Sequence, residues 1–292
     1  MIAAGRLAAA FASLLFPRPP AAGALAVSTP ATLDEAIATV LAPVPTATPT
    51  PAPTPGPMVL GVGELHQTAG TAAIASSLSR FTHKVWPLIA ARVSDLIVET
   101  WVTDGACGKA EAAAVGDVAR TTERPAATEN EIVALLTRAK ASGARPHILK
   151  VSCSEYQLLA PPGGGGARQP VDFERMLALI EQKLEGMVTD VLATRPVADA
   201  DKLIVVYGGA LHNDLHPDPV LAPFSYGLRV FHATAGRYRE LDLYVPEYLE
   251  RNAAMHGEPW FAAWERAAAP GRPVLIRRSP ASFIVVFAND KK

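Results

Sequence analysis

Short apolar runs alternate along this chain with longer stretches in which apolar residues return every three or four positions. The apolar runs are rich in Val, Ile and Leu without strict alternation, which is typical of β-strands covered on both faces. They predict strands at 58–62, 95–100, 147–152 and 202–208. The longer stretches have the period of amphipathic helices. They predict helices at about 70–92, 129–141 and 171–193.

The order of these elements predicts the fold class. Strands that alternate with helices of this length favour an α/β protein, in which helices cross over between parallel strands. Further apolar runs follow at 228–233 and 239–245, and then a helix near 247–267. The last two runs are separated by a turn at Pro280, which favours a C-terminal hairpin. We therefore predict, over 58–292, a single α/β domain with a mainly parallel sheet flanked by helices.

The beginning of the chain has the order of a secretory signal. Arg6 precedes an apolar run of about ten residues, and the small residues of 21–26 follow it. This order predicts a signal peptide over 1–26 and an exported protein, periplasmic or extracellular; a disordered Ala-rich start is the alternative. The run is too short to cross a bilayer as a helix, and no later segment approaches the length of an integral membrane span.

Pro and Thr alternate between Pro43 and Pro57, and this composition favours an extended, solvated backbone rather than packing. We therefore predict a Pro/Thr-rich disordered tether over 27–57. Inside it, the segment 32–41 has the pattern of a short helix, with Thr32 or Asp34 as its N-cap.

Composition and charge narrow the classes of partner. The 292 residues are 49% hydrophobic, which provides one sizeable core. The 27 basic and 28 acidic side chains give a net charge of -1, and Lys and Arg are not concentrated in any stretch. This distribution argues against a nucleic-acid partner. We expect a small molecule or a peptide as the substrate.

Two apolar strands run into the same motif, Gly-x-x-His. The first strand leads into Gly63-Glu64-Leu65-His66, and the strand at 202–208 leads into Gly209-Ala210-Leu211-His212. A third strand delivers Glu99 near its carboxyl end. In open α/β sheets, ligands bind at the carboxyl ends of the strands. If the strands are parallel, the side chains of Glu64, His66, Glu99 and His212 converge at one edge, and these four are the candidate catalytic residues.

These side chains suit two kinds of chemistry. A carboxylate beside an imidazole raises its basicity and fixes its tautomer, which makes a general base near neutral pH. Alternatively, His66, His212 and Glu99 could hold a divalent metal ion such as zinc or manganese. Gly63 and Gly209 would let a ligand approach the backbone, and His216, four residues after His212, is a further candidate ligand-binding residue. Spacing does not choose between these readings.

The two motifs and the strand glutamate resemble the superfamily that unites ChaN-like haem-uptake proteins, the Tiki and TraB/PrgY group and the erythromycin esterases. In that superfamily, paired Gly-x-x-His motifs stand on an α/β scaffold with a glutamate at the end of the strand after the first motif. Here 63–66, Glu99 and 209–212 match those three features, and the resemblance spans about 58–288. It implies a metal-dependent peptidase, a metal-free esterase or a haem binder.

Three functions follow as hypotheses. The first is a hydrolase of an ester or amide bond that activates water directly or through a metal. The second is a protein that binds haem or another small ligand without turnover. The third is a scaffold whose site has degenerated.

The two cysteines lie just beyond predicted strands. Cys107 follows the strand that carries Glu99, and Cys153 directly follows the strand at 147–152. If those strands are parallel neighbours, both thiols lie at one edge of the sheet, and an exported protein would pair them as a disulfide. Two buried free thiols are the alternative.

Overall fold

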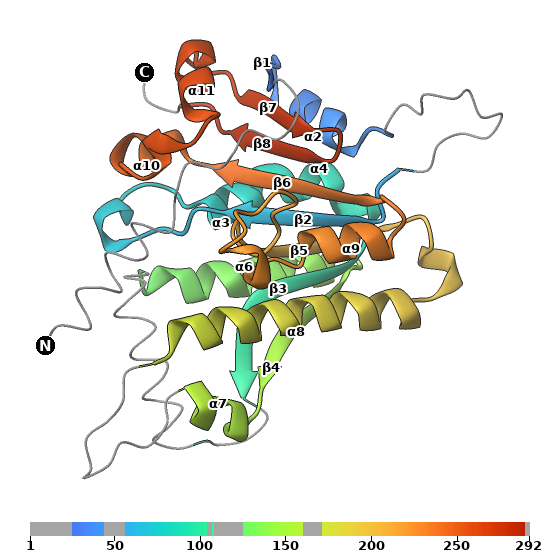
Figure 1. Ribbon diagram of the computed structural model, residues 1–292. Coiled ribbons are helices and arrows are strands. Elements are labelled where there is room, and N and C mark those ends of the chain that lie inside the picture. Colours follow the sequence, from blue (N-terminus) through green and yellow to red (C-terminus); the bar gives the residue numbers. More distant parts are fainter. Residues whose placement is uncertain (1–24, 44–55, 104–106, 108–124, 160–170, 290–292) are drawn as a thin grey trace, which may run out of the picture.

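The computed structural model describes residues 25–43, 56–103, 107, 125–159 and 171–289 (Figure 1). These residues form one eight-stranded sheet in the order β1-β7-β8-β6-β2-β5-β3-β4. The strands are β1 (Ala26–Ser28), β2 (Val59–Glu64), β3 (Val93–Thr103), β4 (Arg145–Val151), β5 (Leu203–Gly209), β6 (Tyr238–Tyr244), β7 (Val274–Ser279) and β8 (Ser282–Val286).

The sheet is mainly parallel. From β8 through β6, β2, β5 and β3 to β4, every neighbouring pair of strands is parallel. Only β7 runs against the others, and it pairs with β8 as an antiparallel hairpin around Pro280. The predicted α/β class, the mainly parallel sheet and the C-terminal hairpin are confirmed.

Helices cover both faces of the sheet because successive strand residues point to opposite sides. Leu60, Leu96 and Val205 pack against the helices of one face, and their neighbours Val59, Ile97 and Ile204 pack against those of the other. The first face carries α2 (Leu33–Leu41), α3 (Ser77–Arg80), α4 (Trp86–Ile89) and α6 (Ala127–Ala141). The second face carries α7 (Cys153–Leu159), α8 (Phe173–Thr194) and α9 (Gly227–Ala233), and Figure 1 shows α8 and α9 in front of the sheet.

A third cluster lies near the hairpin, where α10 (Pro246–Arg251) and α11 (Phe261–Ala267) pack against β7 and β8. The predicted helix near 247–267 is therefore two helices. The predicted helix at 70–92 also divides, because a π-helical turn over Phe81–Val85 precedes Pro87, which has no backbone N–H to donate. Single 3-10 turns occur at Ala69–Thr71, Ala90–Arg92, Val197–Asp199, Ala222–Phe224 and Met255–Gly257.

Part of the predicted tether is folded. β1 pairs with β7, and α2 buries Ile37, Val40 and Leu41 in the core, so that 26–43 belongs to the domain. The predicted short helix and its Thr32 cap are confirmed, since the Thr32 side chain accepts a hydrogen bond from the Glu35 N–H. The tether prediction was wrong for 27–43 because the apolar face of this short helix packs on the sheet. The predicted signal peptide and the Pro/Thr run lie mostly outside the described residues.

The two cysteines are bonded to each other. Cys107 and Cys153 form a disulfide, and β3 and β4 are parallel neighbours, so both parts of that prediction are confirmed. In the described ranges, no helix is both long enough and apolar enough to cross a membrane.

Candidate functional site

Glu64 and His66 form a hydrogen-bonded pair at the carboxyl end of β2. The Nδ1 atom of His66 lies 2.8 Å from Oε1 of Glu64. The other carboxylate oxygen of Glu64 accepts a hydrogen bond of 2.6 Å from the Tyr207 hydroxyl on β5. The Glu64 side chain is 6% exposed and that of His66 is 31% exposed. A carboxylate at Nδ1 favours the tautomer that carries its proton there, which leaves Nε2 of a neutral His66 as an acceptor.

Glu99 lies at an irregularity in β3 rather than at the strand's end. The register between β3 and β4 shifts between Val98 and Trp101, and the pairing of β3 with β5 stops at Val98. A bulge of this kind redirects a side chain. As a result, Oε2 of Glu99 accepts a 2.6 Å hydrogen bond from the Gly209 N–H at the end of β5.

His212 faces the same glutamate from the loop after β5. Its Nε2 atom lies 3.9 Å from Oε1 of Glu99, and its side chain is 4% exposed. Its Nδ1 atom lies 2.7 Å from the Phe224 carbonyl oxygen and donates to it, because a carbonyl only accepts. The backbone of His212 is held in place as well, since the Ser225 hydroxyl donates a hydrogen bond to the His212 carbonyl oxygen.

Gly209 lies between the Glu64–His66 pair and the Glu99–His212 pair. A Cβ atom added there would lie 3.0 Å from Nε2 of His66 and 3.6 Å from Oε2 of Glu99. Both groups therefore approach the same point on the backbone of β5. The structure brings Glu64, His66, Glu99 and His212 to one edge of the sheet through these contacts. Glycine at 209 keeps the space between the two pairs open.

The other two ligand-binding candidates have different surroundings. A Cβ at Gly63 would lie 2.7 Å from both the Ala210 Cα and the Asn213 Oδ1, so this glycine lets the second motif pack directly on β2. His216 is exposed, and its backbone N–H donates to the Asp214 side chain. Gly63 thus has a packing role, and the backbone of His216 is held in the loop after the second motif.

A buried ionic cluster supports that loop. Arg278 donates to Asp214 and to Glu240, and Oε2 of Glu240 accepts from the Leu215 N–H. Burial raises the pKa of Glu240 to about 8; Arg278 opposes this shift, and the nearby carboxylates of Asp214 and Asp242 add to it. Burial alone would lower the pKa of Arg278, but these carboxylates raise it above its usual range. The cluster leaves no local signal in the sequence, because its members come from distant segments.

Tyr207 is a second residue that sequence analysis did not assign to the site. Its side chain is buried on the face of β5 that packs in the first cluster. Its place two residues before Gly209 was the available signal, because it puts the hydroxyl near the end of a central strand.

The hydrogen bonds of His66 and His212 suit a metal site, but the distances between the candidate metal ligands do not. In both histidines Nδ1 is held by an oxygen, as in many metal-binding imidazoles. However, within the part of the chain that the structure describes, no three His, Cys, Asp or Glu side chains are close enough together to hold a metal ion.

Comparisons with known proteins find no family model, no curated protein and no solved structure that matches the chain.

Proposed function

We propose that the chain is a hydrolase that cleaves an ester or amide bond at the edge formed by β2, β3 and β5. The observation that carries this proposal is the Glu64–His66 pair: a buried carboxylate holds Nδ1 of a partly exposed imidazole at 2.8 Å. That geometry is what a general base requires, because it fixes the tautomer and stabilises the imidazolium that forms.

The proposed reaction starts at Nε2 of His66. This atom takes a proton from water as the water attacks the carbonyl carbon of the substrate, and Glu64 stabilises the resulting positive charge. Tyr207 acts through Glu64, since its hydroxyl fixes the orientation of the carboxylate. Glu64 and Tyr207 are thus positioning residues, and His66 is the catalytic residue.

The second pair can provide the proton that the leaving group needs. Because Nδ1 of His212 already donates to a carbonyl, an additional proton on this ring goes to Nε2, which faces Glu99. As the bond to the leaving group breaks, His212 would donate this proton to the leaving oxygen or nitrogen, which departs as an alcohol or an amine.

The proposal is tested with the purified chain and a panel of carbonyl substrates. An activated ester, an alkyl ester and an anilide are assayed with the wild type and with His66→Ala. Removing a general base lowers the rate by about 100- to 10,000-fold. His83→Ala is the matched control, because His83 is exposed and its ring bonds to the Ser79 carbonyl.

Two outcomes would contradict the proposal. Hydrolysis that His66→Ala leaves unchanged would place the activity elsewhere. Absence of hydrolysis together with a Soret band after haem addition would favour the ligand-binding function that the superfamily resemblance also implies.

A further inference from the structure

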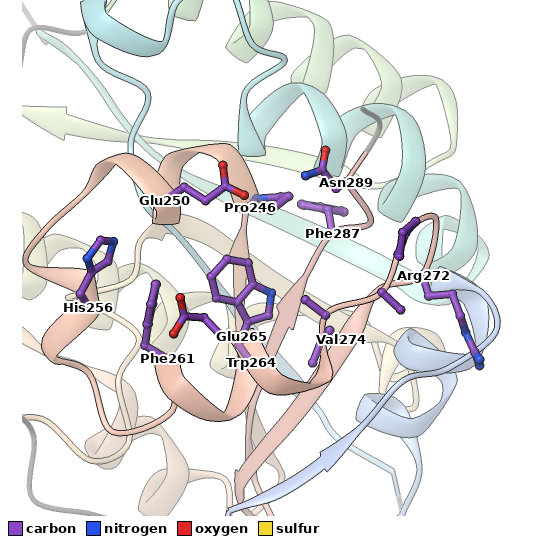
Figure 2. A pocket seen from close by; sticks show the side chains of 13 residues that line it. Pro246, Glu250, His256, Phe261, Trp264, Glu265, Arg272, Val274, Phe287 and Asn289 are labelled. Carbon is purple, nitrogen blue, oxygen red and sulfur yellow. The ribbon is translucent and has the colours of Figure 1, made fainter. Parts of the chain in front are cut away.

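A second concave site lies apart from the four candidate residues. A cavity of about 440 Å³ opens between α10, α11 and the end of β8, and none of Glu64, His66, Glu99 or His212 lines it (Figure 2). Its volume falls in the range of small-molecule sites. The hydrolase proposal makes no use of this cavity.

The walls of the cavity are aromatic and buried. Phe261 and Trp264 of α11 are each 5% exposed, and Phe287, just after β8, is 4% exposed. The Phe261 and Trp264 rings contact each other edge to face, with centroids 5.1 Å apart. Pro246 completes this apolar surface at the start of α10. Such walls favour a ligand with an apolar or aromatic body.

The rim of the cavity is acidic. Glu250 of α10 and Glu265 of α11 are both exposed and both line the cavity. Among the described residues, neither carboxylate has a hydrogen-bond or ion-pair partner. Figure 2 shows them on either side of the Trp264 ring. They place negative charge beside aromatic rings.

The one arginine of the rim is directed elsewhere. The Arg272 guanidinium donates to the carbonyl oxygens of Thr29 and Pro30, and Figure 2 shows its side chain pointing away from the aromatic walls. Its donors therefore hold the segment between β1 and α2. The charged side chains that line the cavity are thus two carboxylates and one guanidinium, and His256 lines it as well.

We propose that this cavity binds a small organic cation, an ammonium group carried on an apolar or aromatic body. The apolar walls would cover the body of the ligand, and Glu250 and Glu265 would pair with its charge. A carboxylate-bearing ligand of the same shape would meet repulsion from the same two glutamates.

The test uses the full chain and three probes with the same ring and similar length: 2-phenylethylammonium, 2-phenylethanol and 3-phenylpropionate. Binding is measured by calorimetry and by NMR titration of the tryptophan indole N–H signals. We expect saturable binding of the ammonium with a Kd in roughly the millimolar range. The alcohol and the carboxylate should each bind at least about tenfold more weakly than the ammonium.

Charge variants locate the site. The double variant E250Q/E265Q should weaken binding of the ammonium about tenfold, since it removes both carboxylates and keeps the shape. The matched control is E129Q/E174Q, which makes the same change in net charge at two exposed glutamates outside the cavity. Both that control and His66→Ala should leave the Kd within about twofold.

Three results would overturn the inference. The first is equal or tighter binding of the alcohol or the carboxylate. The second is an affinity for the ammonium that E250Q/E265Q leaves unchanged. The third is no saturable binding of the ammonium up to about 20 mM. None of these results bears on hydrolysis at His66, so the two proposals fail or stand separately.

Discussion

Nδ1 of His66 lies 2.8 Å from Oε1 of Glu64, the residue two positions earlier in the chain. Glu64 is the last residue of β2, and His66 follows in the loop. The carboxylate is buried under the Tyr207 hydroxyl, while the imidazole reaches solvent. A segment of three residues therefore holds the buried Glu64 carboxylate in contact with the accessible His66 imidazole.

Tyr207→Phe tests the hydrogen bond from the Tyr207 hydroxyl to the Glu64 carboxylate. The substitution removes one hydrogen bond to a buried carboxylate, which is worth about 1.5 to 3 kcal/mol. We expect a lower free energy of unfolding in urea and a kcat/KM for hydrolysis reduced about 3- to 30-fold. A purely structural tyrosine would lower stability and leave kcat/KM of the folded enzyme unchanged, and that pattern would remove Tyr207 from the site.

Gly209→Ala tests the space between the two pairs. The added Cβ would lie 3.0 Å from Nε2 of His66, so the imidazole must shift. We expect kcat/KM to fall about 10- to 100-fold with little change in stability, because small displacements of a reacting group are costly. Gly186→Ala is the control: it lies within α8 with open space around it, and it should stabilise the fold by about 0.5 to 1 kcal/mol. Equal activity of the two variants would refute the arrangement.

The ionic cluster predicts a dependence of stability on pH. The pKa of Glu240 is about 8 in the folded state and near 4.5 in the unfolded chain, so the folded protein binds its proton more tightly. The stabilisation from this group is complete below pH 4.5 and is lost as the pH rises through about 8. Urea unfolding at pH 5, 6.5 and 8 measures it. Glu240→Gln should show a flatter decline over this range, and an identical slope in both proteins would contradict the prediction.

The disulfide predicts the effect of reduction. Cys107 and Cys153 are 46 positions apart, and closing a loop of that size stabilises a fold by about 4 kcal/mol on the chain-entropy model. Reduction should therefore lower the midpoint of urea unfolding. Titration of thiols in denaturant without reductant should find none, whereas two reactive thiols per chain would contradict the bond.

The strand pattern was enough to predict the sheet and the edge at which the motifs meet. Val, Ile and Leu runs fix where β2 and β5 lie, and parallel pairing then places Glu64 beside Gly209. The exact position of Glu99 was beyond the pattern, because the bulge after Val98 depends on how β3 separates from β5. Tyr207 was missed since its role depends on a hydrogen bond across strands that lie 143 positions apart.

Short apolar segments were the least predictable elements. The run at 228–233 has the length of a strand but forms α9, whose Val230 packs on the second face of the sheet. The segment 27–43 looked like part of a tether because its composition blends into the Pro/Thr run. Its fold depends on pairing of β1 with β7, which lies about 250 positions away in sequence and leaves no local signal.

A double-mutant cycle on Glu64 and His66 tests most directly whether the two residues act as one unit in hydrolysis. The kcat/KM of wild type, Glu64→Gln, His66→Ala and the double variant is measured on the best ester of the panel. Because Glu64 acts only through the imidazole, the double variant should be no slower than His66→Ala, within about threefold. If the two reductions instead multiply, Glu64 and His66 act independently, and the general-base account of this site is wrong.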